Sequence, residues 1–129
     1  MRGRADIIAA ARGCVGARFR PHGRDPAHGL DCVGVAAVAF GRKVPGDYAI
    51  RGGSAGEVAR VAGVAGLRAV VPEQARAGDL VLIDAGPGQL HLAILTEAGF
   101  VHADAGLRRV VEVPGRPAGC MMAAWTMGD

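Results

Sequence analysis

The sequence predicts an α+β domain in which N-terminal helices pack on an antiparallel β-sheet of about five to six strands. Apolar residues recur at helical spacing in roughly the first half of the chain, and short apolar runs punctuated by Gly and Pro follow from Leu67 onwards. Helices followed by consecutive strands with short connections favour an antiparallel sheet. At 129 residues, the chain is expected to form a single domain spanning 1–129.

Three helices are expected before the strands. The first follows Asp6, where "IIAAARGCV" has apolar residues at helical spacing. Asp31 can cap a second helix over Cys32–Phe40, and Gly41 ends it. The stretch "SAGE" at 54–57 has the S-x-x-E form of a capping box and precedes a short third helix.

The remaining segments are expected to form one long loop and then strands. Residues 17–30, "ARFRPHGRDPAHGL", carry Pro and Gly at turn spacing and predict an ordered loop. The expected strands are "LRAVV", "LVLID", "LHLAILT", "FVHA", "RVVEV" and "CMMAAWTM".

Composition narrows the function classes. A 50% hydrophobic content excludes a disordered chain. The net charge of +3 comes with scattered arginines and only 4% aromatic residues, so we expect no nucleic-acid partner, whereas a basic surface suits an acidic polymer such as a bacterial cell wall. Arg12 interrupts the N-terminal apolar stretch, so we expect no signal peptide, and no segment predicts a membrane partner.

Cysteine usage singles out Cys32. The three cysteines form no C-x-x-C pair and indicate neither a disulfide framework nor a ribbon-type zinc site. Cys14 and Cys120 lie within apolar patterns and are expected to pack in the core. Cys32 begins a helix after a polar loop, where the helix N-terminus favours a thiolate and lowers the pKa of a thiol. It is therefore a candidate nucleophile, and the alternative is a small hydrophobe that starts a buried helix.

A thiol nucleophile needs a base, and two histidines lie in neighbouring strand patterns. His91 could stand beside Cys32, with His102 behind it fixing the imidazole tautomer. A three-residue loop that pairs Thr96 with Phe100 would point the two histidines to opposite faces. We therefore expect either a bulge or a position of His91 before regular pairing begins.

Four blocks of this sequence resemble the NlpC/P60 cysteine peptidases of bacterial cell walls. They are "GLDCVGV", "AGDLVLI", "LHLAIL" and "FVHA", in the family's order. The resemblance runs from about Gly16 to Val113. The stretch "FRPHGRDPAHGLDCVG" looks especially like the subgroup encoded with phage and gene-transfer-agent tail genes.

The resemblance implies a papain-like fold with Cys32 as nucleophile, His91 as general base and His102 as orienting residue. It implies a substrate that is a peptidoglycan stem peptide, cut commonly at the γ-D-glutamyl to diamino acid bond, with no cofactor and no metal. A phage-like tail or its baseplate proteins would then carry the cytoplasmically made enzyme to the cell wall. The expected substrate-binding residues are Arg20, His22, Arg24 and Asp31.

The sequence departs from the family at two positions, since His22 stands where many members have Tyr and Val33 replaces a common Ser. Three alternatives also stay open. Cys32, His91 and His102 are competent zinc ligands, although their separations match no common structural site. The chain could be a non-catalytic tail or assembly subunit that retains the fold. It could also be a related acyltransferase or amidase using the same nucleophile.

Overall fold

The computed structural model describes residues 2–44, 55–84, 90–117 and 120–127. Within them the helices are α1 (Arg4–Gly13), α2 (Cys32–Phe40) and α3 (Ala55–Val64), with a 3-10 turn, η1 (Pro72–Gln74). The strands are β1 (Arg24–Asp25), β2 (Gly29–Leu30), β3 (Arg68–Val70), β4 (Leu80–Asp84), β5 (Leu90–Leu95), β6 (Gly99–Asp104), β7 (Arg109–Pro114) and β8 (Cys120–Thr126).

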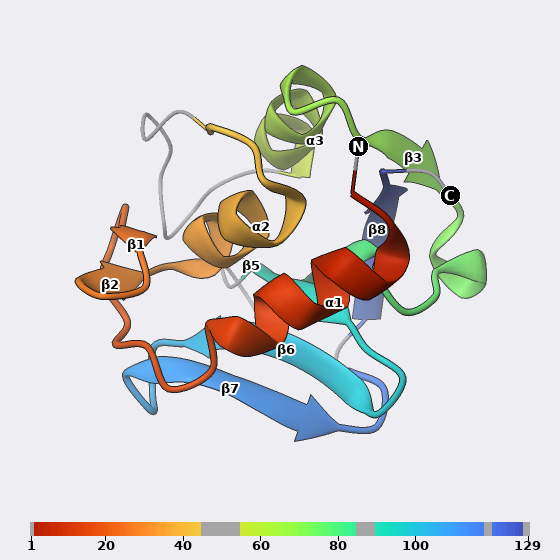
Figure 1. The fold of residues 1–129 in the computed structure, drawn as a ribbon. Helices are drawn as coiled ribbons and strands as arrows, with labels where there is room; N and C mark the ends of the chain where they lie inside the picture. Colours follow the sequence, from red (N-terminus) through yellow and green to blue (C-terminus); the bar gives the residue numbers. More distant parts are fainter. Residues whose placement is uncertain (1, 45–54, 85–89, 118–119, 128–129) are drawn as a thin grey trace.

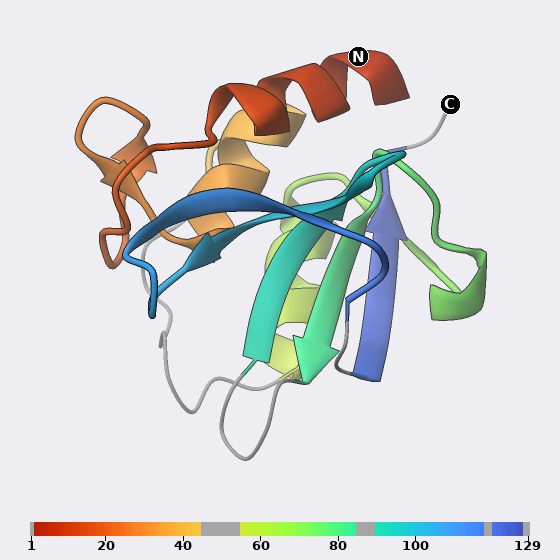
Figure 2. The ribbon, with the colours of Figure 1, turned by 90° about the horizontal axis from the view of Figure 1, so that it is seen from below.

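Six of the strands form one antiparallel sheet in the order β3-β8-β4-β5-β6-β7. The other two, β1 and β2, form a small hairpin within the segment expected to be a loop. Figure 1 shows α1 and α2 side by side, and Figure 2 shows β6 and β7 curving beneath them. The predicted fold class, helices packed on an antiparallel sheet, is confirmed.

Local signals predicted α2 well and α1 less well. Helix α2 spans the expected residues, and Gly41 ends it with a φ of +65°, a left-handed conformation that suits glycine. Helix α1 begins before Asp6, because Gly3 is its N-cap and the Asp6 carboxylate accepts a hydrogen bond from the Gly3 N–H at 3.2 Å. The expected capping box at 54–57 begins outside the described residues.

The sheet buries apolar side chains on both faces. The larger cluster joins α1 and α2 to the sheet residues that face them, among them Leu82, Leu92 and Val101. A smaller cluster on the other face includes Ala93 and Leu95. Alternate residues of β5 therefore point to different clusters, as strand geometry requires. No described helix is long and apolar enough to cross a membrane.

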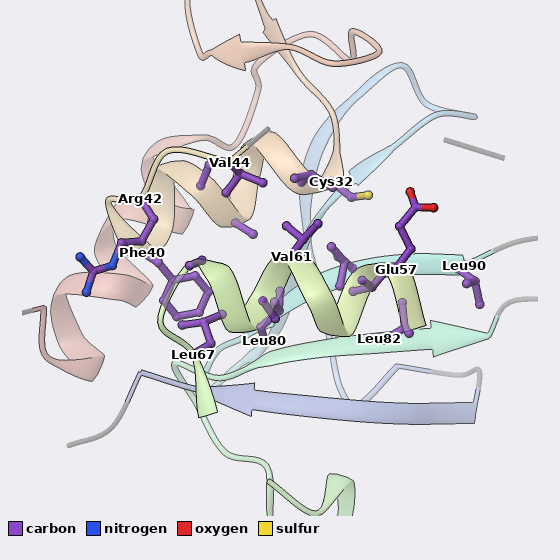
Figure 3. A pocket seen from close by; sticks show the side chains of 17 residues that line it. Cys32, Phe40, Arg42, Val44, Glu57, Val61, Leu67, Leu80, Leu82 and Leu90 are labelled. Carbon is purple, nitrogen blue, oxygen red and sulfur yellow. The ribbon is translucent and has the colours of Figure 1, made fainter. Parts of the chain in front are cut away.

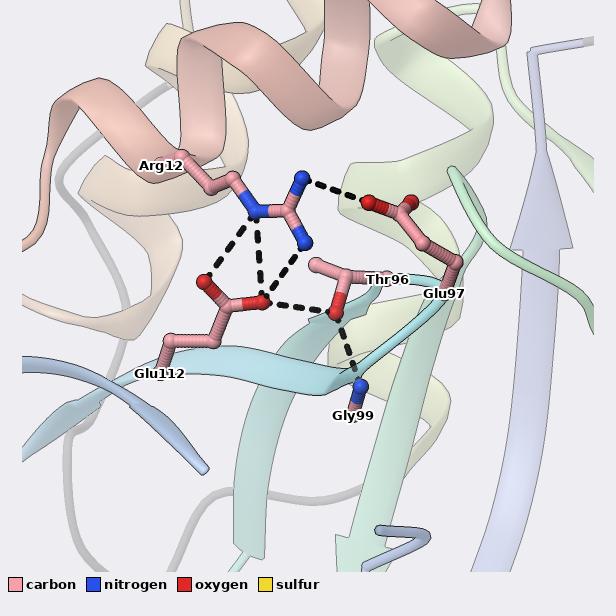
Figure 4. A network of polar contacts seen from close by, with 5 residues as sticks. All are labelled: Arg12, Thr96, Glu97, Gly99 and Glu112. Carbon is pink, nitrogen blue, oxygen red and sulfur yellow. Dashed lines mark hydrogen bonds and ion pairs between the residues drawn. The ribbon is translucent and has the colours of Figure 1, made fainter. Parts of the chain in front are cut away.

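A polar network fixes α1 to the turn between β5 and β6 (Figure 4). Arg12 of α1 donates to both carboxylate oxygens of Glu112 in β7, at 3.0 to 3.2 Å, and pairs with Glu97 at 2.6 Å. The Thr96 hydroxyl donates to Glu112 at 2.8 Å and accepts from the Gly99 N–H at 2.9 Å. The guanidinium holds the pKa of Glu112 below its ordinary value.

Candidate active site

The N-terminus of α2 is held by the carboxylate of Asp31, which is fully buried. One carboxylate oxygen accepts from the Gly34 N–H at 2.7 Å, as expected for an N-cap, and from Arg24 at 3.1 Å. The other accepts from the His22 N–H at 2.8 Å. Asp31 therefore joins the preceding loop to the helix that carries Cys32, and its predicted contact with substrate stays a prediction.

Two glycines, Gly23 and Gly34, let this loop approach the helix backbone. A Cβ on Gly34 would lie 2.1 Å from the Gly23 carbonyl oxygen, and a Cβ on Gly23 would lie 2.2 Å from the Gly29 carbonyl oxygen. Neither position has room for a side chain, so the backbones pack directly on one another. The loop, the hairpin of β1 and β2, and the start of α2 consequently form one unit around Cys32.

Cys32 is half-buried at the first turn of α2 and lines an apolar cavity. Burial raises the pKa of its thiol to about 11, with the Asp31 carboxylate contributing in the same direction. The backbone N–H groups of Leu92, Val33 and Cys32 itself oppose this by favouring the thiolate. The expectation that the helix N-terminus lowers this pKa is therefore wrong for the resting protein, because desolvation outweighs the N–H groups.

The register of the β5–β6 hairpin differs from the expected one. Ile94 pairs with Val101 and Leu95 with Phe100, and the Thr96 N–H donates to the Gly99 carbonyl at 2.8 Å. The loop therefore has two residues rather than three, and the pairing of Thr96 with Phe100 is wrong. Because this register places His102 across from position 93, both histidines belong to the same face of the hairpin.

The structure brings His91 and His102 together. Their ring centroids are 6.3 Å apart and the planes meet at 77°, an edge-to-face arrangement. No bulge interrupts β5 at His91, which pairs with Ile83 of β4. His91 lies beyond the last β5–β6 pair but within regular pairing to β4, and the register set by the two-residue loop, rather than either expected device, places the two histidines on one face.

A carboxylate that the sequence reasoning missed lies next to His102. Asp104 has one oxygen 4.0 Å from His102 Nε2, while its other oxygen accepts from the N–H groups of Gly106 and Leu107. Burial lowers the pKa of His102, the Asp104 charge opposes that shift, and His91 adds to it. The i, i+2 spacing in "HAD" on a predicted strand was the signal that could have revealed this neighbour.

Cys32 and the His91 side chain lie on different faces of β5. The sulfur interacts with the Leu92 N–H, and Leu92 belongs to the cluster that faces α2. His91 precedes Leu92 and alternates with it, which places its side chain toward the other face. Within the described part of the chain, the polar contacts of the sulfur are to backbone N–H groups rather than to the His91 ring.

The predicted substrate-binding residues surround the loop before α2. Arg20 and His22 are exposed, and His22 has a φ of +59° while its N–H donates to Asp31. Arg24 is partly exposed and forms an ion pair with Asp31 at 3.1 Å. Two of these side chains thus face solvent, and their contact with substrate stays a prediction.

The other cysteines differ from Cys32. Cys14 is 1% exposed within the main core, its Sγ donates to the Ala10 carbonyl, and burial raises the pKa of its thiol, so the expected packing role is confirmed. The side chain of Cys120 lies outside the described residues. Among the residues that are described, no three His, Cys, Asp or Glu side chains lie so that they could hold a metal ion.

Comparison with solved structures identifies the fold. The NlpC/P60 domain of the peptidoglycan hydrolase SagA matches with 28% identity and a TM-score of 0.61, over 88% of this chain and 90% of that one. The P60 domain of an M. avium subspecies paratuberculosis antigen matches with 20% identity and a TM-score of 0.66, over 96% and 93%.

A third structure, the peptidoglycan hydrolase RipB from Mycobacterium tuberculosis, matches with 23% identity and a TM-score of 0.64, over 98% of this chain and 65% of that one. No family model and no curated protein matches the chain. The chain thus has the fold of NlpC/P60 domains, and the structures it resembles include domains of peptidoglycan hydrolases.

Proposed function

We propose that the protein is a cysteine peptidase that hydrolyses an amide bond in peptidoglycan stem peptides. The observation that carries this proposal is the position of Cys32 at a helix N-terminus, against strand β5, which carries His91 of the His91–His102 pair. The resemblance to the NlpC/P60 domain of a peptidoglycan hydrolase supports the substrate class. We further propose the γ-D-glutamyl to diamino acid bond as the one that is cut.

In the proposed reaction the Cys32 sulfur attacks the amide carbonyl, and its proton passes to His91. His91 then protonates the leaving amine, which gives a thioester and a free amine, and later removes a proton from the water that releases the acid. The Cys32 N–H is the proposed oxyanion donor. His102 acts on the orientation of His91, and the imidazole comes within reach of the sulfur when substrate binds.

The test is digestion of purified peptidoglycan, with mass spectrometry of the released fragments. Wild type should release stem-peptide fragments whose masses identify the bond, while Cys32→Ala and His91→Ala should release none. His28→Ala is the matched control, because His28 is an exposed histidine that pairs with Asp25 on the nearby loop. If wild type cuts no wall from several species while its fold is intact, the non-catalytic subunit and the acyltransferase or amidase alternatives replace the peptidase.

We also propose that a phage-like tail delivers the protein to the cell wall. The similarity of the loop before Cys32 to tail-associated members supports this proposal. Mass spectrometry of purified phage-like particles from the producing strain tests it. The protein should be present at a fixed ratio to the tail subunits, and its absence from intact particles would contradict delivery by a tail.

A further inference from the structure

The apolar cavity beside Cys32 is a second feature of the site, and the proposed peptide hydrolysis assigns it no role. It lies between α2 and α3, and leucines of β4 and β5 also line it (Figure 3). Aliphatic side chains form most of its wall, including those of Val58, Val61, Ala62 and Leu82. The charged residues that line it, Arg42 and Glu57, lie towards opposite ends in Figure 3, so its middle offers apolar contact only.

The size of the cavity limits what could fill it. Its volume is about 80 Å³, roughly half of the ~150 Å³ apolar cavity that holds a benzene molecule. By proportion it accommodates about three carbon atoms. An apolar cavity of this kind favours an aliphatic group, since a polar or charged group would lose its hydration without gaining a partner.

The candidate nucleophile, the Cys32 thiol, lies at the edge of this cavity. Cys32 lines the cavity from the first turn of α2, and Figure 3 shows its sulfur near the end where Glu57 and Leu90 lie. The histidine pair belongs to the other face of β5. An acyl group attached to the sulfur could therefore place its chain in the cavity while the leaving group departs on the histidine side.

We propose that the cavity between α2 and α3 binds a short aliphatic acyl group, so that Cys32 also accepts acyl groups of about four carbons from esters. The sulfur attacks the ester carbonyl, the S–C bond forms and the C–O bond breaks, and the thiol proton leaves with the alcohol. Water then hydrolyses the thioester to a carboxylic acid and restores the thiol. This activity requires the nucleophile of the proposed function but not its peptide substrate.

The test measures the acylation of Cys32 by p-nitrophenyl acetate, butyrate and octanoate, with the rate of Cys32→Ala subtracted. Butyrate should react roughly tenfold faster than acetate, because the cavity buries two further methylenes. Octanoate should react more slowly than butyrate, because its chain exceeds the cavity. Equal rates for acetate and butyrate, or rates that rise steadily to octanoate, would overturn the inference.

A pair of variants on α3 distinguishes an effect of filling the cavity from an effect of adding a leucine elsewhere on the helix. Ala62 is buried and lines the cavity, so Ala62→Leu should fill it and remove the preference for butyrate. Ala59 is exposed on the same helix and does not line the cavity, so Ala59→Leu should keep the preference. Labelling of Cys32 by iodoacetamide should be equal in both variants. If Ala62→Leu does not fold, the chain-length series on wild type decides the question.

Failure of the acyl-site proposal can be distinguished from failure of the peptidase proposal. Wild type that cuts peptidoglycan but shows no optimum at butyrate refutes the acyl site alone. Wild type with a butyrate optimum that cuts no wall refutes the peptidase proposal alone. Cys32 that is acylated by none of the esters refutes the acyl site, whatever the wall digestion gives.

Discussion

Removing the Asp31 carboxylate should destabilise the protein and disorganise the site together. Asp31→Ala deletes the N-cap of α2, which costs about 1 kcal/mol. It also removes the carboxylate that accepts hydrogen bonds from Arg24 and from the His22 N–H. Breaking a buried ion pair by removing one partner costs about 3–5 kcal/mol, and this part is smaller here because the Arg24 side chain is 27% exposed. We expect a total loss of about 3 kcal/mol.

Urea unfolding measures this loss directly. With a slope of about 2 kcal/mol per molar urea, the unfolding midpoint of Asp31→Ala should fall by about 1.5 M. Asp31→Asn keeps one acceptor oxygen for the Gly34 N–H, so its unfolding midpoint should lie between those of Asp31→Ala and wild type. Asp25→Ala is the matched control, because Asp25 is an exposed aspartate of the same loop. A shift for Asp31→Ala no larger than that of the control would refute the reasoning.

Three further predictions concern packing, electrostatics and the thiol. Gly34→Ala should lower the unfolding midpoint and abolish activity, because the new Cβ meets a loop carbonyl, whereas Gly13→Ala, which meets nothing within 4 Å, should leave both intact or raise the midpoint. The pKa of Glu112 is lowered in the folded state, so its contribution to stability is present at neutral pH and is lost as pH falls through that lowered pKa. Glu112→Gln should thus be less stable than wild type at pH 7, and the difference in urea midpoint should shrink in acid. The alkylation rate of Cys32 by iodoacetamide should rise with pH towards about 11, and a plateau below pH 8 would contradict the burial argument.

The sequence was sufficient where local signals decide the structure. Helix α2 has both of its ends determined by neighbouring residues, the Asp31 cap and the left-handed Gly41, so its bounds could be predicted without knowledge of the fold. The resemblance to NlpC/P60 sequences then pointed to Cys32, His91 and His102. The structure brings the two histidines together and places Cys32 against the strand of one of them.

Long-range contacts explain what the sequence could not predict. The two-residue turn after β5 depends on the Thr96 hydroxyl, which accepts from the Gly99 N–H and donates to Glu112. Glu112 is in turn held by Arg12, one hundred residues earlier in the chain. Strand patterns alone do not reveal such a contact, so the expected register was off by one residue. The cavity beside Cys32 was missed for the same reason, because it forms only when α3 packs beside α2.

Cys32 shows why burial has to be considered together with the helix N-terminus. A helix N-terminus stabilises a negative charge by about 0.3–1 kcal/mol, and up to about 2 kcal/mol when partly buried. A thiol pKa of about 11 instead disfavours the resting thiolate by roughly 3 kcal/mol relative to an ordinary thiol. A preformed thiolate is therefore scarce at neutral pH, and attack requires a base that takes the proton as the sulfur–carbon bond forms. Burial lowers the pKa of His102 and so favours its neutral form, which in the proposed mechanism orients His91 without adding a positive charge that would hinder proton uptake. Catalysis by this thiol should for that reason depend on His91 more strongly than it would for an exposed cysteine that ionises unaided.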